Sequence, residues 1–276
     1  MSKKVAVVTG ANKGIGFAIV AALCEAGFPG DVILTARSEQ LGREAVEKMK
    51  SAGHRAVFHQ LDITSQTSAL ELQTFLKENY GGLDLLINNA GIAYKNDATE
   101  PFGEQAEVTM RTNFWGTLWV CHALFPLLRP NARVVNVSSF VSKRSLDKCS
   151  PELQAKLRDP TISEEGLCSF MNEFVAAAKR GDHESKGWAN TAYGISKVGV
   201  TVLSMIQART LAKTRPGDGI LLNACNPGWV RTDMAGQSAA KSPEEGAETP
   251  VYLALLPEGA KEPHGRFLSD KKVEEW

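Results

Sequence analysis

The stretch VAVVTGANKGIG, residues 5–16, joins a short apolar run to a turn that contains three glycines. The apolar residues from Phe17 to Ala26 follow at once, so the expected order is strand, glycine turn and helix. Gly10 permits the tight turn, Gly14 lets the backbone approach a pyrophosphate closely, and Gly16 allows close packing of the helix. The spacing differs from the commoner G-x-G-x-x-G. Its place after the first strand nevertheless favours a dinucleotide site, because the amides at a helix start attract phosphate.

The rest of the chain alternates apolar strands with helical stretches, which is typical of an α/β domain. Further strands are expected at 31–36, 56–61, 83–88, 133–137, 220–224 and 266–268. Helices are expected at 39–52, 68–79, 104–128, 191–214 and 243–256. With 276 residues, 43% of them hydrophobic, the chain can bury a full core. We therefore predict one domain over residues 1–276, with a Rossmann-type, doubly wound, seven-stranded parallel sheet.

Arg37 follows the second predicted strand, at the position where a dinucleotide fold selects its cofactor. A carboxylate there would hold the ribose hydroxyls of NAD. Here Arg37 and Lys13, which lies in the glycine turn, provide two cations that could converge on a 2′-phosphate. The sequence therefore favours NADPH/NADP as the cofactor. The alternative is that both are ordinary surface cations.

The segment YGISK, residues 193–197, places a tyrosine and a lysine four positions apart. On a helix this spacing puts both side chains on one face. A phenol has an unperturbed pKa of about 10, and a neighbouring ammonium lowers it by favouring the phenolate. Tyr193 is therefore a candidate proton donor, although the spacing alone is more typical of a solvated pair.

Two predicted strands end in polar residues that should meet at the carboxyl end of the sheet. The first, LDLLINNAG at 83–91, ends in small and amide side chains that would line a cofactor. The second, RVVNVSS at 133–139, ends in two serines. Successive side chains of a strand point to opposite sides, so only one of these serines can face the site. We expect it to be Ser139 and not Ser138.

These motifs, with Asn113 and Pro227-Gly228, resemble the short-chain dehydrogenases/reductases over nearly the whole chain. The resemblance is strongest to the vertebrate cytosolic carbonyl reductases and their fish 20β-hydroxysteroid dehydrogenase relatives, through residues 105–110, 227–234 and 242–250. It implies NADPH-dependent reduction of aldehydes, ketones and quinones to alcohols, with xenobiotics, 20-oxo steroids and prostaglandins among the candidate substrates. The alternatives are a 20β-hydroxysteroid dehydrogenase specialised for progestogens, an enzyme that mainly oxidises alcohols, and an NADP-binding sensor or scaffold that has lost its chemistry.

The resemblance also implies roles for individual residues. Ser139 and Tyr193 would hydrogen-bond the carbonyl oxygen, and Tyr193 would donate the proton. Lys197 would lower the pKa of Tyr193 and bind the nicotinamide ribose, while Asn113 would hold a water that links Lys197 to solvent. The expected cofactor-binding residues are Gly10, Asn12, Lys13, Gly14, Ile15, Gly16, Arg37, Asp62, Ile63, Asn89, Ala90, Gly91, Tyr193, Lys197, Pro227, Gly228, Val230 and Thr232.

Aromatic and apolar residues near these segments suggest the wall of a substrate pocket. Glutathione binds to relatives near the segment that follows residues 88–91, which implies glutathione conjugates among the substrates. The aromatic and apolar side chains could equally belong to the core. The expected substrate-binding residues are Tyr94, Lys95, Asn96, Gln105, Ser139, Phe140, Trp229 and Met234.

Tyr193 follows Ser139 by 54 positions, whereas about a dozen separate these residues in a typical family member. The extra segment, about 143–188, has a helical pattern. TISE at 161–164 fits a capping box, and an apolar stripe follows it. We expect this stripe to cover the helix that carries Tyr193, which favours a monomer, as in the carbonyl reductases that the chain resembles. The alternative is that the stripe docks on a second chain or a partner. The stripe comprises Leu167, Phe170, Met171, Phe174, Val175 and Ala178.

Charge and composition bear on the partners, the location and the metal content to be expected. The 31 Lys and Arg residues balance 31 Asp and Glu residues without a basic stripe, so we expect no nucleic-acid partner. The apolar run at 251–256 is too short to span a bilayer, and MSKK at residues 1–4 leads into a strand, so we expect a cytoplasmic protein without a membrane contact. Five scattered cysteines and five histidines show no metal-ligand spacing, so we expect neither disulfides nor a metal.

Overall fold

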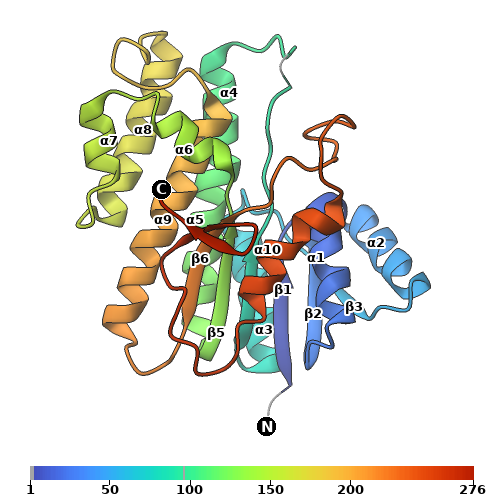
Figure 1. Ribbon diagram of the computed structural model, residues 1–276. Coiled ribbons are helices and arrows are strands. Elements are labelled where there is room, and N and C mark those ends of the chain that lie inside the picture. The colour runs from blue at the N-terminus through green and yellow to red at the C-terminus, as the bar shows by residue number, and fades with distance from the viewer. Residues whose placement is uncertain (1–2, 96) are drawn as a thin grey trace.

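Eight strands form one sheet in the order β3-β2-β1-β4-β5-β6-β7-β8, in a computed structural model that describes residues 3–95 and 97–276 (Figure 1). The first seven pair in parallel, as predicted, and β8 pairs antiparallel with β7. The strands are β1 Lys4–Val8, β2 Gly30–Ala36, β3 Ala56–Gln60, β4 Leu83–Asn88, β5 Leu128–Val137, β6 Leu221–Asn226, β7 Phe267–Ser269 and β8 Lys272–Glu274. The predicted doubly wound α/β class is therefore confirmed.

Helices cover both faces of the sheet. Alternate residues of β1 show why both faces must be covered: Val5 and Val7 pack with α3, α5 and α9, while Ala6 and Val8 pack with α1, α2 and α10. A strand that is apolar on both sides is typical of a parallel sheet. The α-helices are α1 Gly14–Glu25, α2 Glu39–Ser51, α3 Gln66–Tyr80, α4 Phe102–Met110, α5 Thr117–Leu124, α6 Phe140–Leu146, α7 Pro151–Leu157, α8 Glu164–Arg180, α9 Ala192–Thr214 and α10 Pro243–Ala254.

The prediction missed β8 because the turn before it carries no glycine. Asp270 and Lys271 both adopt a positive φ, 47° and 62°, which a two-residue hairpin turn commonly achieves with Asn-Gly. Here neighbouring side chains hold the turn. Lys241 pairs with Asp270 at 2.5 Å, and the backbone N–H of Lys271 donates to Thr249 Oγ1 at 3.1 Å. Contacts distant in sequence thus replace the local signal.

The single helix expected over 104–128 is wrong in detail. Between α4 and α5 the chain forms a π-helix, η1 Arg111–Gly116, and after α5 a 3₁₀ turn, η2 Phe125–Leu127. A π-turn contains more residues than an α-turn yet keeps the apolar pattern helical, so periodicity does not reveal it. The predicted start of β5 at Arg133 was also late, because β5 begins at Leu128 and carries a register shift against β4.

The expected helical insertion consists of α6, α7 and α8. The N-cap of α8 is Ser163, whose Oγ accepts from the N–H of Gly166, so the predicted capping box headed by Thr161 is wrong. Thr161 instead bonds Asp159, which turns the chain before the helix begins. The apolar stripe of α8 packs within this chain against α4 and α9. Of its residues, Leu167, Met171, Phe174 and Ala178 are buried, and Phe170 and Val175 are partly buried against the same core.

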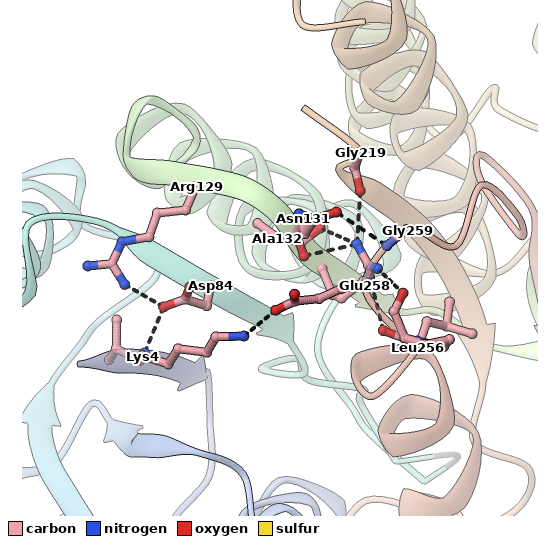
Figure 2. Close-up of polar contacts among 12 residues, drawn as sticks. Lys4, Asp84, Arg129, Asn131, Ala132, Gly219, Leu256, Glu258 and Gly259 are labelled. Atoms are coloured by element: carbon pink, nitrogen blue, oxygen red, sulfur yellow. Dashed lines mark hydrogen bonds and ion pairs between the residues drawn. The ribbon is translucent and has the colours of Figure 1, made fainter. Parts of the chain in front are cut away.

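The amino end of the sheet is closed by charged residues that bind one another (Figure 2). Arg129 pairs with Asp84 at 2.7 Å, and Lys4 pairs with Glu258 at 2.6 Å. The guanidinium of Arg133, only 4% exposed, donates to backbone carbonyls at five positions. Its charge is therefore stabilised by the dipoles of these carbonyls, with a coulombic contribution from the nearby Glu258 carboxylate. These carbonyls belong to Asn131, Ala132, Gly219, Leu256 and Pro257.

Candidate active site

The segments after β1 and β4 are bound together at the carboxyl end of the sheet. Thr9 Oγ1 accepts from the backbone N–H groups of Asn89 and Ala90, both at 3.0 Å. The Asn89 amide donates in return to the carbonyls of Thr9 and Gly10 at 3.0 and 3.1 Å. The predicted cofactor residues 89–91 are thus fixed against the glycine turn. Thr9 was missing from the candidate residues, although a hydroxyl at a strand end was the available signal.

Two glycines of the turn are required by close approach. Gly10 has φ 61°, and a Cβ there would lie 2.8 Å from Ala90 Cα. A Cβ on Gly16 would lie 2.5 Å from both the Asn89 amide nitrogen and the Gly10 carbonyl oxygen. The role expected for Gly16 in close packing is therefore seen, but its neighbours are the turn itself and Asn89. Any larger residue at either position would push the turn and the 89–91 segment apart.

The start of α1 suits a phosphate group. Its N-cap residue, Lys13, is extended and makes no side-chain capping hydrogen bond, and its first turn contains no acidic residue. The first amides of a helix lack partners within the helix, and the helix dipole makes this end positive. These residues therefore fit the pyrophosphate of a dinucleotide. Gly14, Ile15 and Asn12 lie in this turn, with Asn12 and Ile15 partly exposed.

The two cations expected to select the cofactor differ in their surroundings. Arg37 follows β2 directly, is exposed, and makes no side-chain ion pair with any residue of 3–95 or 97–276. Lys13 instead pairs with Asp233 at 2.6 Å, and both side chains are mostly exposed. The ion pair connects the glycine turn to the segment after β6. To bind a 2′-phosphate, as predicted, Lys13 would have to give up its carboxylate partner, whereas Arg37 would not.

Tyr193 and Lys197 lie on the first two turns of α9. Thr191 caps this helix by accepting from the N–H of Gly194 at 3.1 Å, which fixes where the Y-x-x-x-K face begins. Lys197 is buried, and its ammonium donates to the Val137 carbonyl at 2.8 Å. The Lys197 nitrogen also lies 5.7 Å from the centre of the Tyr193 ring. The predicted pair is therefore adjacent, and its lysine is tied to the end of β5.

Burial dominates the protonation of this pair. It raises the pKa of Tyr193 to about 12, with a hydrogen bond involving Ser139 acting in the opposite direction. It lowers the pKa of Lys197 to about 8. The expected lowering of the Tyr193 pKa by Lys197 is thus not found, because desolvation outweighs the ammonium and the ammonium points to Val137. At neutral pH Tyr193 carries its proton and Lys197 its charge.

The two serines at the end of β5 face different surroundings. Ser138 Oγ lies 2.6 Å from Thr201 Oγ1 and donates to the Lys197 carbonyl at 3.2 Å, so it faces α9. Ser139 is the N-cap of α6, where its Oγ accepts from the N–H of Val141, and its hydroxyl meets Tyr193. The arrangement is the one expected from strand alternation. Ser139 is therefore the serine placed to share a ligand with Tyr193.

Asn113 lies in the π-helix and joins three parts of the site. Its Oδ1 accepts from the N–H of Ile92 at 2.8 Å, and its amide donates to the Ile92 carbonyl and to Ser196 Oγ, both at 2.9 Å. A Cβ on Gly91 would lie 3.1 Å from Asn113 Oδ1 and 3.7 Å from the Lys197 nitrogen. Asn113 thus fixes the segment after β4 against α9, beside Lys197. Its proposed water link remains a prediction.

The other predicted cofactor residues fall in two places. Asp62 accepts from the N–H and hydroxyl of Thr64, at 2.9 and 2.7 Å. Ile63 is buried against Gly116, where a Cβ would lie 2.9 Å from Ile63 Cδ1. After β6, Pro227 and Val230 are buried, and Gly228 adopts φ 88°. A Cβ on Gly14 would lie 3.2 Å from the Thr232 methyl, so Thr232 borders the glycine turn.

The predicted substrate residues come from separate segments around this end of the sheet. Phe140 begins α6 beside Ser139 and lies under the Arg144 guanidinium at 4.8 Å. Trp229 and Met234 are 50% and 44% exposed, unusually high values for large apolar side chains. Tyr94 is partly buried and Lys95 exposed. Gln105 donates to the Glu100 carbonyl at 2.8 Å, and the predicted Asn96 lies outside the described residues.

Asn226 is a further residue that the list of candidates lacked. Its Oδ1 accepts from the backbone N–H groups of Phe140 and Gly228, at 3.1 and 3.0 Å, and its amide donates to Ser269 Oγ at 3.0 Å. It therefore connects α6, the turn after β6 and β7. An amide at the end of a buried strand was the signal in the sequence, as for Asn88 and Asn89.

No helix within 3–95 or 97–276 is long and apolar enough to cross a membrane. Over the same residues, no group of three His, Cys, Asp or Glu side chains could hold a metal ion. All five cysteines are free thiols.

Comparisons with known proteins agree with this geometry. A family model described as short chain dehydrogenase matches residues 4–151. The chain is 61% identical over 275 residues to carbonyl reductase (NADPH) 1 of Bos taurus, covering 100% of this chain and 99% of that protein. Salutaridine reductase from Papaver somniferum has a solved structure that matches with TM-score 0.85 at 33% identity, covering 97% and 100% of the two chains. The NADPH-bound carbonyl reductase from chicken fatty liver matches with TM-score 0.70 at 25% identity, covering 100% and 99%.

Proposed function

The chain belongs to the short-chain dehydrogenase family, and we propose that the carboxyl end of its sheet is the site at which carbonyl compounds are reduced to alcohols with NADPH. It is an NADPH-dependent carbonyl reductase, an activity supported by 61% identity over the full chain to the bovine enzyme of that name. One observation carries the assignment of the site. Ser139 and Lys197 both adjoin Tyr193, and Lys197 lies next to Gly91, in the segment that Asn89 binds to the glycine turn.

The cofactor site is assigned to three groups of residues. The glycine turn and the first amides of α1 hold the pyrophosphate, and the segment 89–91 supports the turn from the side of β4. Arg37 and Lys13 bind the 2′-phosphate, which favours NADPH over NADH. When bound, NADPH supplies the hydride. Asp62 and Ile63 are assigned to the adenine, and Val230 and Thr232 to the nicotinamide amide.

The chain's own residues handle the proton. Ser139 and Tyr193 hydrogen-bond the carbonyl oxygen of the substrate, which holds that oxygen close to the phenolic proton. Tyr193 then donates its proton to the oxygen. Lys197, charged below a pKa of about 8, stabilises the phenolate that remains. Asn113 keeps the 89–91 segment and α9 together, and it also holds the water through which Lys197 returns a proton.

The substrate class is broad and apolar. Phe140 follows the catalytic Ser139 directly, and with the exposed Trp229 and Met234 it offers aromatic and thioether surface that suits quinones, aromatic aldehydes, 20-oxo steroids and prostaglandins. Tyr94, Lys95 and Gln105 add a polar edge, and with Asn96 they are assigned to glutathione conjugates. Exposed Trp229 and Met234 support this assignment, since large apolar side chains at a surface commonly mark a binding site.

We also propose that the enzyme is a monomer in the cytoplasm. The apolar stripe of α8 is covered by α4 and α9 of the same chain, so it is not free for a second copy. Gly103 and Gly199 permit this packing, because a Cβ there would lie 2.7 Å from Lys179 Cα and 2.8 Å from Met171 Sδ. Light scattering at micromolar concentration should give a mass near 29.9 kDa. A mass near twice this value would refute the monomer.

The test of the function is the oxidation of NADPH, followed by its absorbance, with a quinone such as menadione, an aromatic aldehyde and a 20-oxo steroid. Each assay is repeated with NADH. We expect turnover of several carbonyls with a strong preference for NADPH. A strong preference for the steroid would instead favour the specialised dehydrogenase. Tight NADPH binding without turnover of any carbonyl would refute the enzyme and favour the sensor.

A further inference from the structure

Trp276 follows β8 and returns the chain to the catalytic helices (Figure 1). Its indole N–H donates to Ser142 Oγ at 2.8 Å, and its ring lies 6.0 Å from the Arg158 guanidinium of α7. The ring is partly buried against the core formed by α4, α9 and the helices of the insertion. Ser142 is fully buried in the first turns of α6. This contact therefore joins residues 134 positions apart.

The contact continues inward to the catalytic lysine. Ser142 Oγ lies 3.4 Å from Thr201 Oγ1, and Thr201 donates to the Lys197 carbonyl at 3.0 Å. Ser138 Oγ lies 2.6 Å from the same Thr201 hydroxyl. The three hydroxyl-bearing residues are at most 1% exposed. In such a buried environment a lost hydrogen bond cannot be replaced by water, so the chain of hydroxyls has one favoured arrangement.

The reaction depends on the relative placement of the two helices that this chain connects. Ser139 caps α6 three residues before Ser142, while Tyr193 and Lys197 belong to α9. A small displacement of α6 would therefore move the Ser139 hydroxyl away from Tyr193. Catalytic geometry is sensitive to displacements of well under 1 Å.

We propose that Trp276 is a positioning residue for catalysis, acting through Ser142 to hold α6 in register with α9. The indole N–H can only donate, and it donates to the Ser142 hydroxyl, which otherwise has Thr201 as its polar neighbour. The inference rests on the proposed function, because it concerns the alignment of Ser139 with Tyr193. The role of Trp276 also assigns a role to β8, because this strand directs the chain toward α6.

The test compares Trp276→Phe, Ser142→Ala and the double variant in the NADPH oxidation assay. Trp276→Phe removes the donor but keeps an aromatic ring beside Arg158. We expect kcat to fall about fivefold, the effect of losing one hydrogen bond from the aligned state, with KM for NADPH unchanged. If Trp276 acts through Ser142, the double variant should be no slower than the slower single variant.

Trp119→Phe is the matched control, since Trp119 is also partly buried but its indole N–H makes no hydrogen bond to another described residue. It should retain the wild-type kcat. Wild-type kcat in Trp276→Phe, or losses that multiply in the double variant, would overturn the inference. A lower Tm with unchanged kcat would show a structural role only and would also overturn it. Absence of turnover by the wild-type enzyme would instead refute the proposed function, so the two failures are distinguishable.

Discussion

At the amino end of the sheet Arg129 pairs with Asp84 (Figure 2) and Arg133 is buried among carbonyls. At the carboxyl end, by contrast, Arg37 is exposed and makes no ion pair with another described residue. Both ends contain arginines next to strand termini. At the amino end each guanidinium binds other groups of the protein. At the carboxyl end the first amides of α1 lack a side-chain cap, and the cations face solvent.

This difference separates stability from function. Partners within the chain stabilise the fold, but they leave nothing for a ligand to bind. Open amides and exposed cations contribute little to stability and are available to an anion. Substitutions at the amino end should therefore change the free energy of unfolding and leave kcat alone. Substitutions of the exposed cations and of the Tyr193 hydroxyl at the carboxyl end should do the reverse.

The largest expected effect is that of Tyr193→Phe on turnover. Loss of the proton donor should lower kcat about 1,000-fold or more, with NADPH affinity and Tm nearly unchanged. Steady-state assays measure kcat, fluorescence titration measures the affinity for NADPH, and thermal unfolding measures Tm. Tyr80→Phe is the matched control, because the Tyr80 hydroxyl bonds Asp31 at 2.9 Å near the other end of the sheet. Retained activity in Tyr193→Phe would remove Tyr193 as the acid.

Arg133→Met tests the amino end. Removing the buried guanidinium leaves several carbonyls unpaired, so the free energy of unfolding should fall by about 3 kcal/mol. The fraction that remains folded should keep the wild-type kcat. Urea denaturation measures the free energy of unfolding. Arg129→Met, at an ion pair whose side chains are 19% and 16% exposed, should cost less, and a larger loss there would contradict the contrast between the fully and the partly buried arginine.

Arg37→Asp tests the choice of cofactor. The carboxylate should repel the 2′-phosphate and raise KM for NADPH about 30-fold, with a much smaller change for NADH. Steady-state kinetics with each cofactor give the ratio. Arg55→Asp, an equal change of charge at an exposed position before β3, should leave the ratio unaltered. Equal effects of Arg37→Asp on both cofactors would disprove its role.

The pH dependence should reveal Lys197. Because burial lowers its pKa from 10.5 to about 8, kcat/KM should fall about tenfold for each pH unit above about 8 as the ammonium is lost. Stability has the opposite sign. Between pH 8 and 10.5 the unfolded chain binds the extra proton, so the free energy of unfolding gains a rising contribution with pH. Lys197→Met should abolish that contribution; if it persists, another group is responsible.

The smallest effect is expected for Asp233→Asn. Releasing Lys13 from its exposed ion pair should lower KM for NADPH by about threefold and leave KM for NADH unchanged. Asp270→Asn is the control, because it breaks the neighbouring pair with Lys241 instead. A higher KM for NADPH in Asp233→Asn would mean that the ion pair orders the turn and does not compete for Lys13.

Local signals were sufficient for much of this molecule. Seven parallel strands follow from apolar runs, and the glycine turn and the 193–197 pair follow from short spacings. The choice between Ser138 and Ser139 needed only the alternation of a strand. Each of these features depends on residues within one short stretch of the chain.

The features that sequence missed depend on contacts between distant segments. Lys13 is paired with a residue 220 positions away, which no local pattern indicates. The pKa of Tyr193 is set by how deeply the completed fold buries it, so spacing to Lys197 predicted the wrong direction. The turn before β8 has no glycine because Lys241 and Thr249 hold it.

The π-helix η1 constrains how the gene for this chain can change in length. An α-helix rotates about 100° per residue, so one residue more or less shifts the phase of everything on one side of the change. The wider turn at residues 111–116 holds the apolar face of α4 in phase with α5 while it directs Asn113 toward Ile92 and Ser196. Single substitutions in this segment keep that phase. A deletion of one codon would restore α-helical winding and rotate α4 away from α8, so a loss of length would displace a whole helix, whereas a substitution acts through its own side chain alone.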